Sequence, residues 1–163
     1  RYLLRDLVAH VAGQVPPAGA VIDLYAGVGL FSVAAAVTRS ARVTAVEGDR
    51  FAAADLEANA AACVAAVTPV HQAVEAFLAG GVRSGRPDAI ILDPPRTGVS
   101  REALDGMMRL RAATLIYVSC DVATLARDAR RLADAGYAID RLDAFDLFPN
   151  TPHVETVAVF GLR

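Results

Sequence analysis

The amino-acid sequence predicts an α/β fold in which helices cover both faces of a mostly parallel, seven-stranded sheet. Residues 21–31, Val-Ile-Asp-Leu-Tyr-Ala-Gly-Val-Gly-Leu-Phe, pass from an apolar strand through a Gly-x-Gly turn into an apolar helix. This is the typical opening unit of a doubly wound sheet. Strand-like and helix-like runs then alternate along the chain. Residues 137–162 hold two strands without room for a crossover helix, so the final strand is expected to be antiparallel.

Each element follows from its local pattern. A helix over residues 2–14 is expected to stop before Pro16 and Pro17, because proline cannot continue it. Pro69 cannot donate a ladder hydrogen bond, which predicts that the third strand lies at an edge of the sheet. The unbroken apolar run at residues 89–92 indicates a strand buried on both faces. The expected strands are 20–24, 42–47, 67–72, 89–93, 114–119 and two within 137–162, and the later helices are 30–38, 50–65, 74–79, 101–110 and 123–135.

Length and composition narrow the class of protein. With 163 residues the chain is expected to form one domain. Its net charge of −2 argues against a strong sequence-independent grip on nucleic acid, so an RNA substrate would need binding surfaces elsewhere. Two cysteines are too few for a disulfide scaffold and favour a reducing cytoplasm. No signal peptide or membrane span is evident, and because a helix begins at once we expect a piece of a longer protein.

The Gly-x-Gly turn indicates a nucleotide-type cofactor, because such ligands bind beyond the end of the first strand. A dinucleotide site would need a third glycine, which is absent after Gly27 and Gly29. Asp23 ends the first strand, and Glu47 ends the second at about 20 residues after the loop, where a carboxylate meets ribose hydroxyls. These acids suit a cationic ligand, so S-adenosylmethionine is expected rather than NAD. The alternative is that both acids only cap the helices that follow.

A polar stretch also follows the fourth strand. Asp93 begins an Asp-Pro-Pro-Arg sequence, and its two prolines stiffen the turn and hold the carboxylate at the end of the strand. The alternative is a rigid turn without chemistry. Methyltransferases that act on amino groups carry an aromatic residue where Arg96 stands here, so an exocyclic amine is the less expected target.

Cys120 follows the fifth strand and opens a helix, where the helix dipole favours a thiolate. Asp121 opposes that effect or caps the helix. We interpret Cys120 as a nucleophile and Cys63 as a buried apolar side chain. In the loop before the last strand, Glu155 lies beside apolar residues that could raise its pKa, so it is a candidate general base. His153 is the rival base, and the alternative for both is a solvated loop charge or a structural hydrogen bond.

Taken together, five stretches resemble the catalytic domain of the RNA 5-methyluridine methyltransferases, which methylate carbon 5 of uridine in tRNA or ribosomal RNA. They are Asp-Leu-Tyr-Ala-Gly-Val-Gly-Leu-Phe, Ala-Val-Glu, Asp-Pro-Pro-Arg-Thr-Gly, Ser-Cys-Asp-Val-Ala-Thr-Leu-Ala-Arg-Asp and Phe-Pro-Asn-Thr-Pro-His-Val-Glu-Thr-Val, all within residues 21–159. The resemblance implies a Rossmann-like class I fold for S-adenosylmethionine-dependent methyl transfer. It further implies that residues 1–163 are the catalytic domain, in the C-terminal part of a longer protein.

The resemblance also implies roles for single residues. Cys120 would add to carbon 6 of uracil, and Glu155 would later remove the proton from carbon 5, with Asp93 at the junction of cofactor and substrate. Tyr25 and Glu47 match cofactor contacts of the family. The expected cofactor site therefore comprises Asp23, Tyr25, Gly27, Gly29, Glu47 and Asp93, and no metal is expected.

The sequence departs from the family pattern in several places. Leu30 stands where a polar residue is common, and Gln72 and Ala73 stand where an acid often meets the adenine. The family's upstream Phe-x-Gln stretch and RNA-binding domains are not in this sequence, so RNA binding is expected to need them. The alternatives are a cytosine-C5 or small-molecule methyltransferase, or a catalytically silent module that binds cofactor or RNA. An RNA cytosine enzyme usually carries Thr-Cys and Pro-Cys, whereas this chain has Ser-Cys at 119–120 and Pro-Arg at 95–96.

Overall fold

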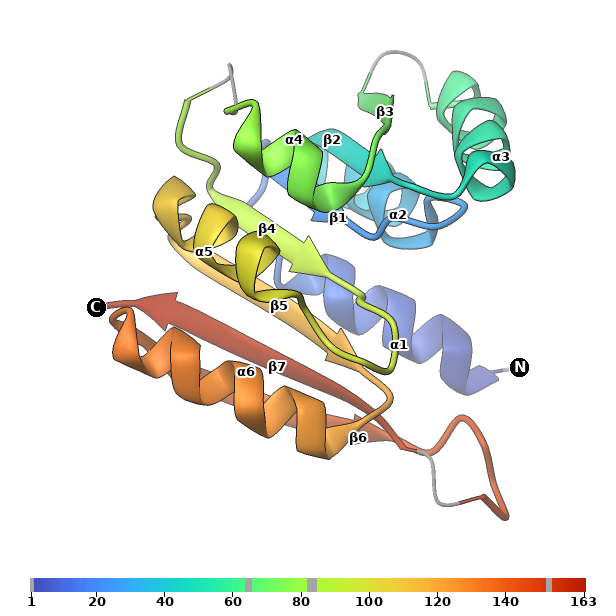
Figure 1. Cartoon of the computed structure of the whole chain (residues 1–163). Helices are drawn as coiled ribbons and strands as arrows, with labels where there is room; N and C mark the ends of the chain where they lie inside the picture. Colours follow the sequence, from blue (N-terminus) through green and yellow to red (C-terminus); the bar gives the residue numbers. More distant parts are fainter. Residues whose placement is uncertain (1, 64–65, 82–84, 152–153) are drawn as a thin grey trace.

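Seven strands form one sheet in the order β3-β2-β1-β4-β5-β7-β6 (Figure 1). The structure is a computed structural model that describes residues 2–63, 66–81, 85–151 and 154–163. Strands β1 to β5 run parallel to one another, and β7 is antiparallel to both β5 and β6. The predicted fold class is thus confirmed, and β3 lies at an edge as Pro69 indicated. The strands are β1 Ala20–Leu24, β2 Arg42–Glu47, β3 Val67–His71, β4 Ala89–Leu92, β5 Thr114–Ser119, β6 Tyr137–Phe145 and β7 Glu155–Leu162.

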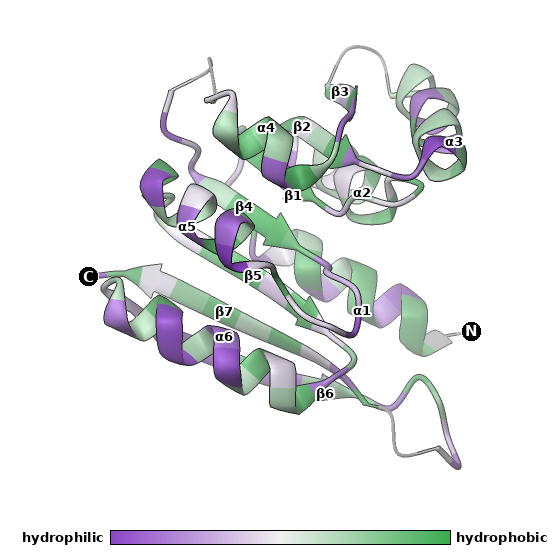
Figure 2. Ribbon diagram, viewed as in Figure 1, coloured by the Kyte–Doolittle hydropathy of each residue, from purple (hydrophilic) through white to green (hydrophobic). Residues whose placement is uncertain are grey.

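Helices cover the sheet in two layers, one on each face. The first three helices pack their buried residues into one apolar cluster and the last three into another, on the opposite face. In Figure 2 the helices α5 and α6 turn hydrophilic residues outward, while the strands behind them are largely hydrophobic. The helices are α1 Tyr2–Gly13, α2 Leu30–Arg39, α3 Arg50–Ala61, α4 Val74–Ala79, α5 Arg101–Leu110 and α6 Val122–Asp134.

Helix α3 ends earlier than the sequence pattern predicted. It stops at Ala61 rather than at residue 65. The amide of Ala62 donates a hydrogen bond to the carbonyl of Asn59, and the amide of Cys63 donates one to the carbonyl of Ala60. These bonds reach back three residues instead of four, so the last turn tightens and the helix closes there. Residues 64–65 lie outside the described residues.

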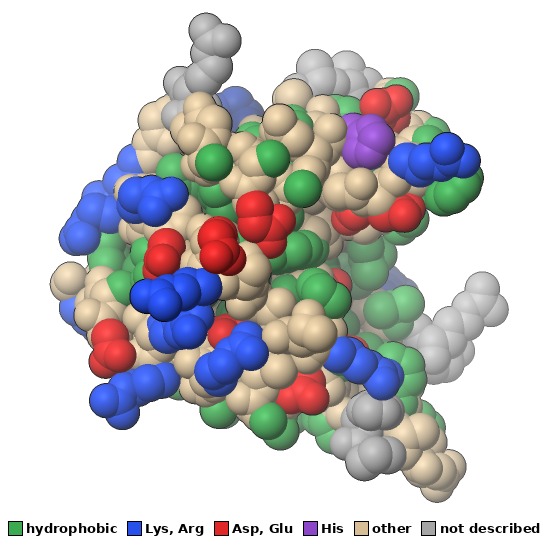
Figure 3. All heavy atoms as spheres, in the orientation of Figure 1, with side chains coloured by type: hydrophobic (Ala, Val, Ile, Leu, Met, Phe, Trp, Pro, Cys, Tyr) green, Lys and Arg blue, Asp and Glu red, His purple; other side chains and the backbone are tan. Residues whose placement is uncertain are grey.

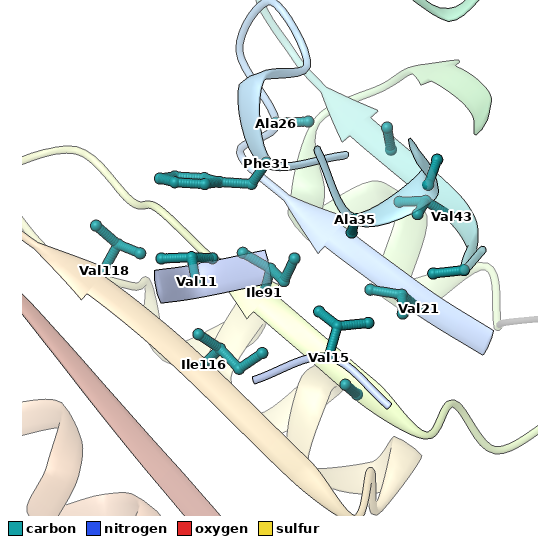
Figure 4. Close-up of a cluster of buried hydrophobic side chains, with 14 of the residues drawn as sticks. Val11, Val15, Val21, Ala26, Phe31, Ala35, Val43, Ile91, Ile116 and Val118 are labelled. Carbon is teal, nitrogen blue, oxygen red and sulfur yellow. The ribbon is translucent and has the colours of Figure 1, made fainter. Parts of the chain in front are cut away.

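The central strands explain why an unbroken apolar run was needed. Ile91 packs into the cluster under α1, α2 and α3, whereas its neighbours Ile90 and Leu92 pack into the cluster under α4, α5 and α6. Successive side chains of a strand point to opposite faces, so both faces of β4 must be apolar. Figure 4 shows Ile91 on the first face among Val11, Phe31 and Ile116.

The topology brings several loops to one edge of the sheet. Strands β1, β2, β4 and β5 are parallel, so their carboxyl ends lie at the same edge of the sheet, and the loops that follow these strands begin there. Because β7 is antiparallel to β5, its first residue, Glu155, lies at that same edge. Ligands of open α/β sheets bind beyond this edge.

Candidate active site

The two glycines after β1 serve different purposes. Gly27 has φ 55° and Gly29 has φ 91°, a left-handed region that favours glycine. A Cβ atom at Gly29 would lie 2.7 Å from Leu56 Cδ1, so this glycine lets the loop approach helix α3. A Cβ atom at Gly27 would meet nothing within 4 Å. The loop is therefore packed at Gly29 and open at Gly27, where a ligand can approach the main chain.

Glu47 ties the glycine loop to the end of β2. Its Oε2 accepts a hydrogen bond from the Gly27 amide at 2.7 Å, and its Oε1 accepts one from the Asp49 amide at 2.7 Å. A carboxylate has about four acceptor positions, so others remain for a ligand hydroxyl. Asp49, not Glu47, caps helix α3 by accepting from the amides of residues 51 and 52. The helix-cap alternative for Glu47 is therefore wrong.

Asp23 lies fully buried at the end of β1. Its Oδ2 accepts a hydrogen bond from Ser32 Oγ at 2.6 Å, whereas its Oδ1 is buried and has no hydrogen-bond partner among the described residues. Burial raises the pKa of this carboxyl to about 7; the bond from Ser32 lowers it, and the charges of Asp93 and Glu47 add smaller rises. Through its bond with Ser32, Asp23 contacts the first turn of α2, so the alternative that Asp23 supports the start of the following helix holds in part.

Asp93 follows β4 directly and lies one strand from Asp23. Its amide donates to the carbonyl of Leu24, which continues the pairing of β4 with β1. The residue is exposed to solvent, although neighbouring protein atoms partly desolvate its carboxyl. That desolvation, and then the negative charge of Glu155, raise the pKa of Asp93 to about 7. Exposure to water screens these effects, so Asp23 is the more strongly perturbed of the two.

Strand register places Cys120 and Glu155 together. In the antiparallel pair of β5 and β7, Ser119 lies opposite Thr156. Cys120 follows Ser119 and Glu155 precedes Thr156, so both residues lie next to this last pair, at the same end of the two strands, and both are partly buried. The charge of Glu155 also acts on the pKa of Asp93, and all three candidate catalytic residues lie at the carboxyl-terminal edge of the parallel strands. The rival base, His153, lies outside the described residues.

The turn after Cys120 is built around a helix cap. Asp121 accepts hydrogen bonds from the amides of Ala123 and Thr124, both at 2.9 Å, and so begins helix α6. These bonds lower the pKa of Asp121. Asp121 is therefore the cap, one of the two roles that the sequence left open. Cys63 packs against the apolar cluster under α1, α2 and α3, as the interpretation of it as an apolar side chain requires.

Tyr25 packs on the face of the sheet that α4, α5 and α6 cover. Its φ is 62°, and its ring packs against the apolar cluster under α4, α5 and α6. Burial, followed by the negative charges of Glu75 and Asp128, raises the pKa of its phenol. The ring lines a cleft of about 450 Å³, among whose lining residues neither Glu47 nor Cys120 appears. The remaining residues of this cleft are Glu75, Pro95, Thr97, Gly98, Val99, Ser100, Arg101, Arg127 and Arg131.

Some contacts at the site were not predicted. Ser32 supplies the hydrogen bond to Asp23, and the signal available was a hydroxyl residue in the first turn after the Gly-x-Gly loop. Arg127 and Asp128 end the Ser-Cys-Asp-Val-Ala-Thr-Leu-Ala-Arg-Asp motif, and no local pattern predicts that they contact other segments. In Figure 3 basic side chains gather over α5 and α6, with acidic ones among them, so the face in view is not uniformly positive.

The described residues form neither a metal-binding cluster nor a membrane-spanning helix. Within those residues, no group of three or more His, Cys, Asp or Glu side chains could hold a metal ion. No helix of that same part of the chain is both long enough and apolar enough to cross a membrane.

Comparison with known proteins gives a consistent result. The family model described as tRNA (Uracil-5-)-methyltransferase matches residues 8–161. An RNA methyltransferase of Thermotoga maritima is 44% identical over 153 residues, which cover 92% of this chain and 34% of that protein. The 23S rRNA (uracil(1939)-C(5))-methyltransferase RlmD of Pseudomonas putida is 42% identical over 148 residues, which cover 86% of this chain and 31% of that protein. The chain thus spans about a third of the length of these relatives.

Solved structures agree. The tRNA (uracil-54, C5)-methyltransferase of Pyrococcus abyssi, in complex with S-adenosyl-L-homocysteine, superposes with a TM-score of 0.82 and 31% identity. The match covers 95% of this chain and 37% of that one. TrmN from Thermus thermophilus superposes with a TM-score of 0.74 at 18% identity, which supports the fold alone.

Proposed function

Because the chain belongs to the tRNA (uracil-5-)-methyltransferase family, we propose that it methylates carbon 5 of a uridine in tRNA or ribosomal RNA. The methyl donor is S-adenosylmethionine, and the reaction passes through a covalent adduct on Cys120. The observation that supports this proposal is the topology of the sheet, in which Asp93 follows β4, Cys120 follows β5 and Glu155 begins the antiparallel β7 at the same edge. A relative that acts on 23S rRNA and a structural neighbour that acts on tRNA support the substrate class.

The residues present fit S-adenosylmethionine. The main chain at Gly27 is open, and Glu47 is fixed beside it with acceptor positions to spare for ribose hydroxyls. The buried, unpartnered Oδ1 of Asp23 and the carboxyl of Asp93 create a negative field at this edge, which suits a ligand with two cationic groups. Tyr25, which precedes this loop, is a further proposed cofactor contact. Gly29 packs the loop itself against α3.

The chemistry follows from the needs of uracil, whose carbon 5 is too weak a nucleophile by itself. The thiolate of Cys120 adds to carbon 6, a Cys120 Sγ–C6 bond forms, and the C5=C6 electrons move onto carbon 5 and the adjacent carbonyl. S-Adenosylmethionine supplies the methyl group as an electrophilic carbon on a cationic sulfur and remains as S-adenosylhomocysteine. The carboxylate of Glu155 then takes the proton from carbon 5. The C5=C6 bond re-forms, the Sγ–C6 bond breaks, and the Cys120 thiolate is regenerated.

RNA binding by this chain alone is proposed to be weak. Its net charge is −2, and the face shown in Figure 3 mixes both signs of charge, so few phosphates can be neutralised. Regions of the longer relatives outside this match are the proposed source of the remaining RNA contacts. We place the reaction in the cytoplasm, which is consistent with two free thiols.

The second candidate function is a catalytically silent module that binds cofactor or RNA. An assay of methyl transfer distinguishes it from the proposed methyltransferase. Radioactive S-adenosylmethionine and unmodified RNA would be incubated with this chain alone and with a longer protein that joins it to the regions its relatives carry outside the match. We expect label in RNA at carbon 5 of uridine, lost in Cys120→Ala and kept in the matched control Cys63→Ala. Label on cytosine, or label that survives Cys120→Ala, would contradict the proposal.

A further inference from the structure

A second polar group lies on the face opposite the Gly27–Glu47 contact, beneath the loop that follows β4. Asp128 of α6 is fully buried. Its Oδ2 accepts hydrogen bonds from the Val99 amide at 3.0 Å and from Tyr117 Oη at 2.8 Å. Its Oδ1 accepts from Arg127 Nε at 2.9 Å and lies 2.8 Å from Arg127 Nη2. We call Val99, Tyr117, Arg127 and Asp128 the Asp128 network.

The loop after β4 is fitted closely to this network. Arg127 Nη2 also donates to the carbonyl of Thr97 at 3.1 Å. Gly98, between the two bonded residues, has φ 76°. A Cβ atom there would lie 2.8 Å from Asp128 Oδ2 and closer still to Arg127 Nη2. Only glycine permits both this backbone conformation and this approach, which explains the Thr-Gly that ends the Asp-Pro-Pro-Arg-Thr-Gly motif.

The network joins the two segments that carry the proposed catalytic groups. On one side, Val99 lies in the loop that Asp93 begins, and two prolines stiffen the chain between them. On the other side, Tyr117 of β5 precedes Cys120 by three residues, and Asp128 lies in α6, which begins two residues after Cys120. The carboxylate of Asp128 therefore joins two sequence motifs through its bond to Val99, which is 29 residues away in the chain.

We propose that Asp128, neutralised by Arg127, is a positioning residue that fixes the Asp93 loop relative to the Cys120 turn. This inference rests on the proposed function for the roles of Asp93 and Cys120. Asp128 does not touch the reacting atoms; it acts by holding two segments whose relative position decides whether nucleophile, base and substrate meet. A misplacement of about 1 Å can cost a hundredfold in rate.

The burial of the charge argues for this role. Burying a carboxylate is costly unless it is paired and hydrogen-bonded. Here Arg127 of the same helix supplies the pairing charge, and the other two contacts reach the loop at Val99 and strand β5 at Tyr117. The exposed pairs Arg130–Asp134 and Arg101–Asp105 each join residues within one helix and hold nothing else. Asp128 alone among these three acids reaches a loop, a strand and its own helix.

The test uses two variants with a matched control. Asp128→Asn keeps an oxygen for Val99 and Tyr117 but cannot accept from Arg127, and Tyr117→Phe removes a single donor. Arg130→Gln, which alters only the exposed pair on the same helix, is the control. The readouts are hydrogen exchange of the Val99 amide, alkylation of Cys120 by iodoacetamide with Cys63 as internal reference, affinity for S-adenosylmethionine, and methyl-transfer rate.

We expect both variants to remain folded at 25 °C. Exchange at Val99 should rise at least tenfold, and alkylation of Cys120 relative to Cys63 should rise at least threefold. The methyl-transfer rate should fall at least tenfold while cofactor affinity changes by less than threefold, a split that simple loss of stability does not produce. Arg130→Gln should change none of these.

The outcomes separate the two proposals. If the wild-type chain neither binds S-adenosylmethionine nor methylates RNA, the proposed function fails, and exchange at Val99 and alkylation of Cys120 still decide whether the network holds the two segments. If folded variants show unchanged exchange at Val99 and unchanged alkylation of Cys120, the positioning role is wrong. Should Asp128→Asn fail to fold, Tyr117→Phe gives the same decision.

Discussion

The acidic residues at the carboxyl-terminal edge predict that cofactor binding depends on pH near neutrality. Asp23 and Asp93 both have pKa values raised to about 7, so below pH 7 they are mostly protonated. A ligand that carries a sulfonium and an ammonium group favours their ionised forms. Affinity for S-adenosylmethionine should therefore rise as pH increases through 7 and level off above pH 8.

The magnitude follows from the fraction ionised. A carboxyl of pKa 7 is about 9% ionised at pH 6 and about 91% at pH 8, so one required carboxylate gives about a tenfold gain in affinity. Two would give about a hundredfold gain. Asp93 is exposed, so its contribution is screened by water, whereas Asp23 is fully buried. A gain above tenfold is therefore expected only if Asp23 also releases its proton when the cofactor binds.

Titration calorimetry at pH 6, 7 and 8 measures this gain directly. Repeating it at pH 6 in buffers of different ionisation enthalpy counts the protons released on binding, which should be about one to two. S-Adenosylhomocysteine, which lacks the sulfonium charge, should show a smaller dependence. Asp93→Asn should reduce the dependence, whereas Asp105→Asn, on the exposed face of α5, should leave it unchanged. Equal affinities at pH 6 and pH 8 without proton release would refute the reasoning.

Three further predictions concern the same edge. Folding raises the pKa of Asp23, so the folded state binds more protons than the unfolded state between about pH 4 and 7, and stability falls as pH rises through this range. Asp23→Asn removes this effect, so it should raise the free energy of unfolding in urea by about 2–4 kcal/mol at pH 8 and by less at pH 5. Glu47→Gln loses an acceptor for the Gly27 or Asp49 amide and should weaken S-adenosylmethionine binding at least tenfold by calorimetry, with unchanged affinity contradicting the ribose role. Gly29→Ala should lower stability by about 1–3 kcal/mol through its contact with Leu56, whereas Gly27→Ala, facing open space, should cost about 1 kcal/mol in thermal unfolding and mainly reduce cofactor binding.

Much of the fold is visible in the sequence because local patterns and topology rules agree. The Val-Ile-Asp-Leu strand, the Gly-x-Gly turn and Pro69 each impose a constraint on the backbone, and the structure satisfies all three. The end of α3 was missed, because an alanine-rich run gives no signal for where hydrogen bonds begin to reach back three residues instead of four.

The candidate site could be predicted only as separate pieces. The sequence showed that Asp93 and Cys120 follow strands, and parallel strands bring their ends to one edge. That Glu155 reaches the same edge depends on the register of β7 against β5, which is a long-range property. The direction of the Tyr25 ring and the burial of Asp128 likewise depend on packing between distant segments, and no local pattern encodes them.

The central claim is a covalent bond between Cys120 and a uracil ring, and one trapping experiment tests it most directly. RNA containing 5-fluorouridine would be incubated with S-adenosylmethionine and the protein, both as this chain and with upstream regions restored. Fluorine cannot leave as a proton does, so Glu155 cannot complete the reaction. The account predicts a protein–RNA adduct that survives denaturant and maps by mass spectrometry to Cys120. No adduct from either form, or an adduct at another residue, would contradict it.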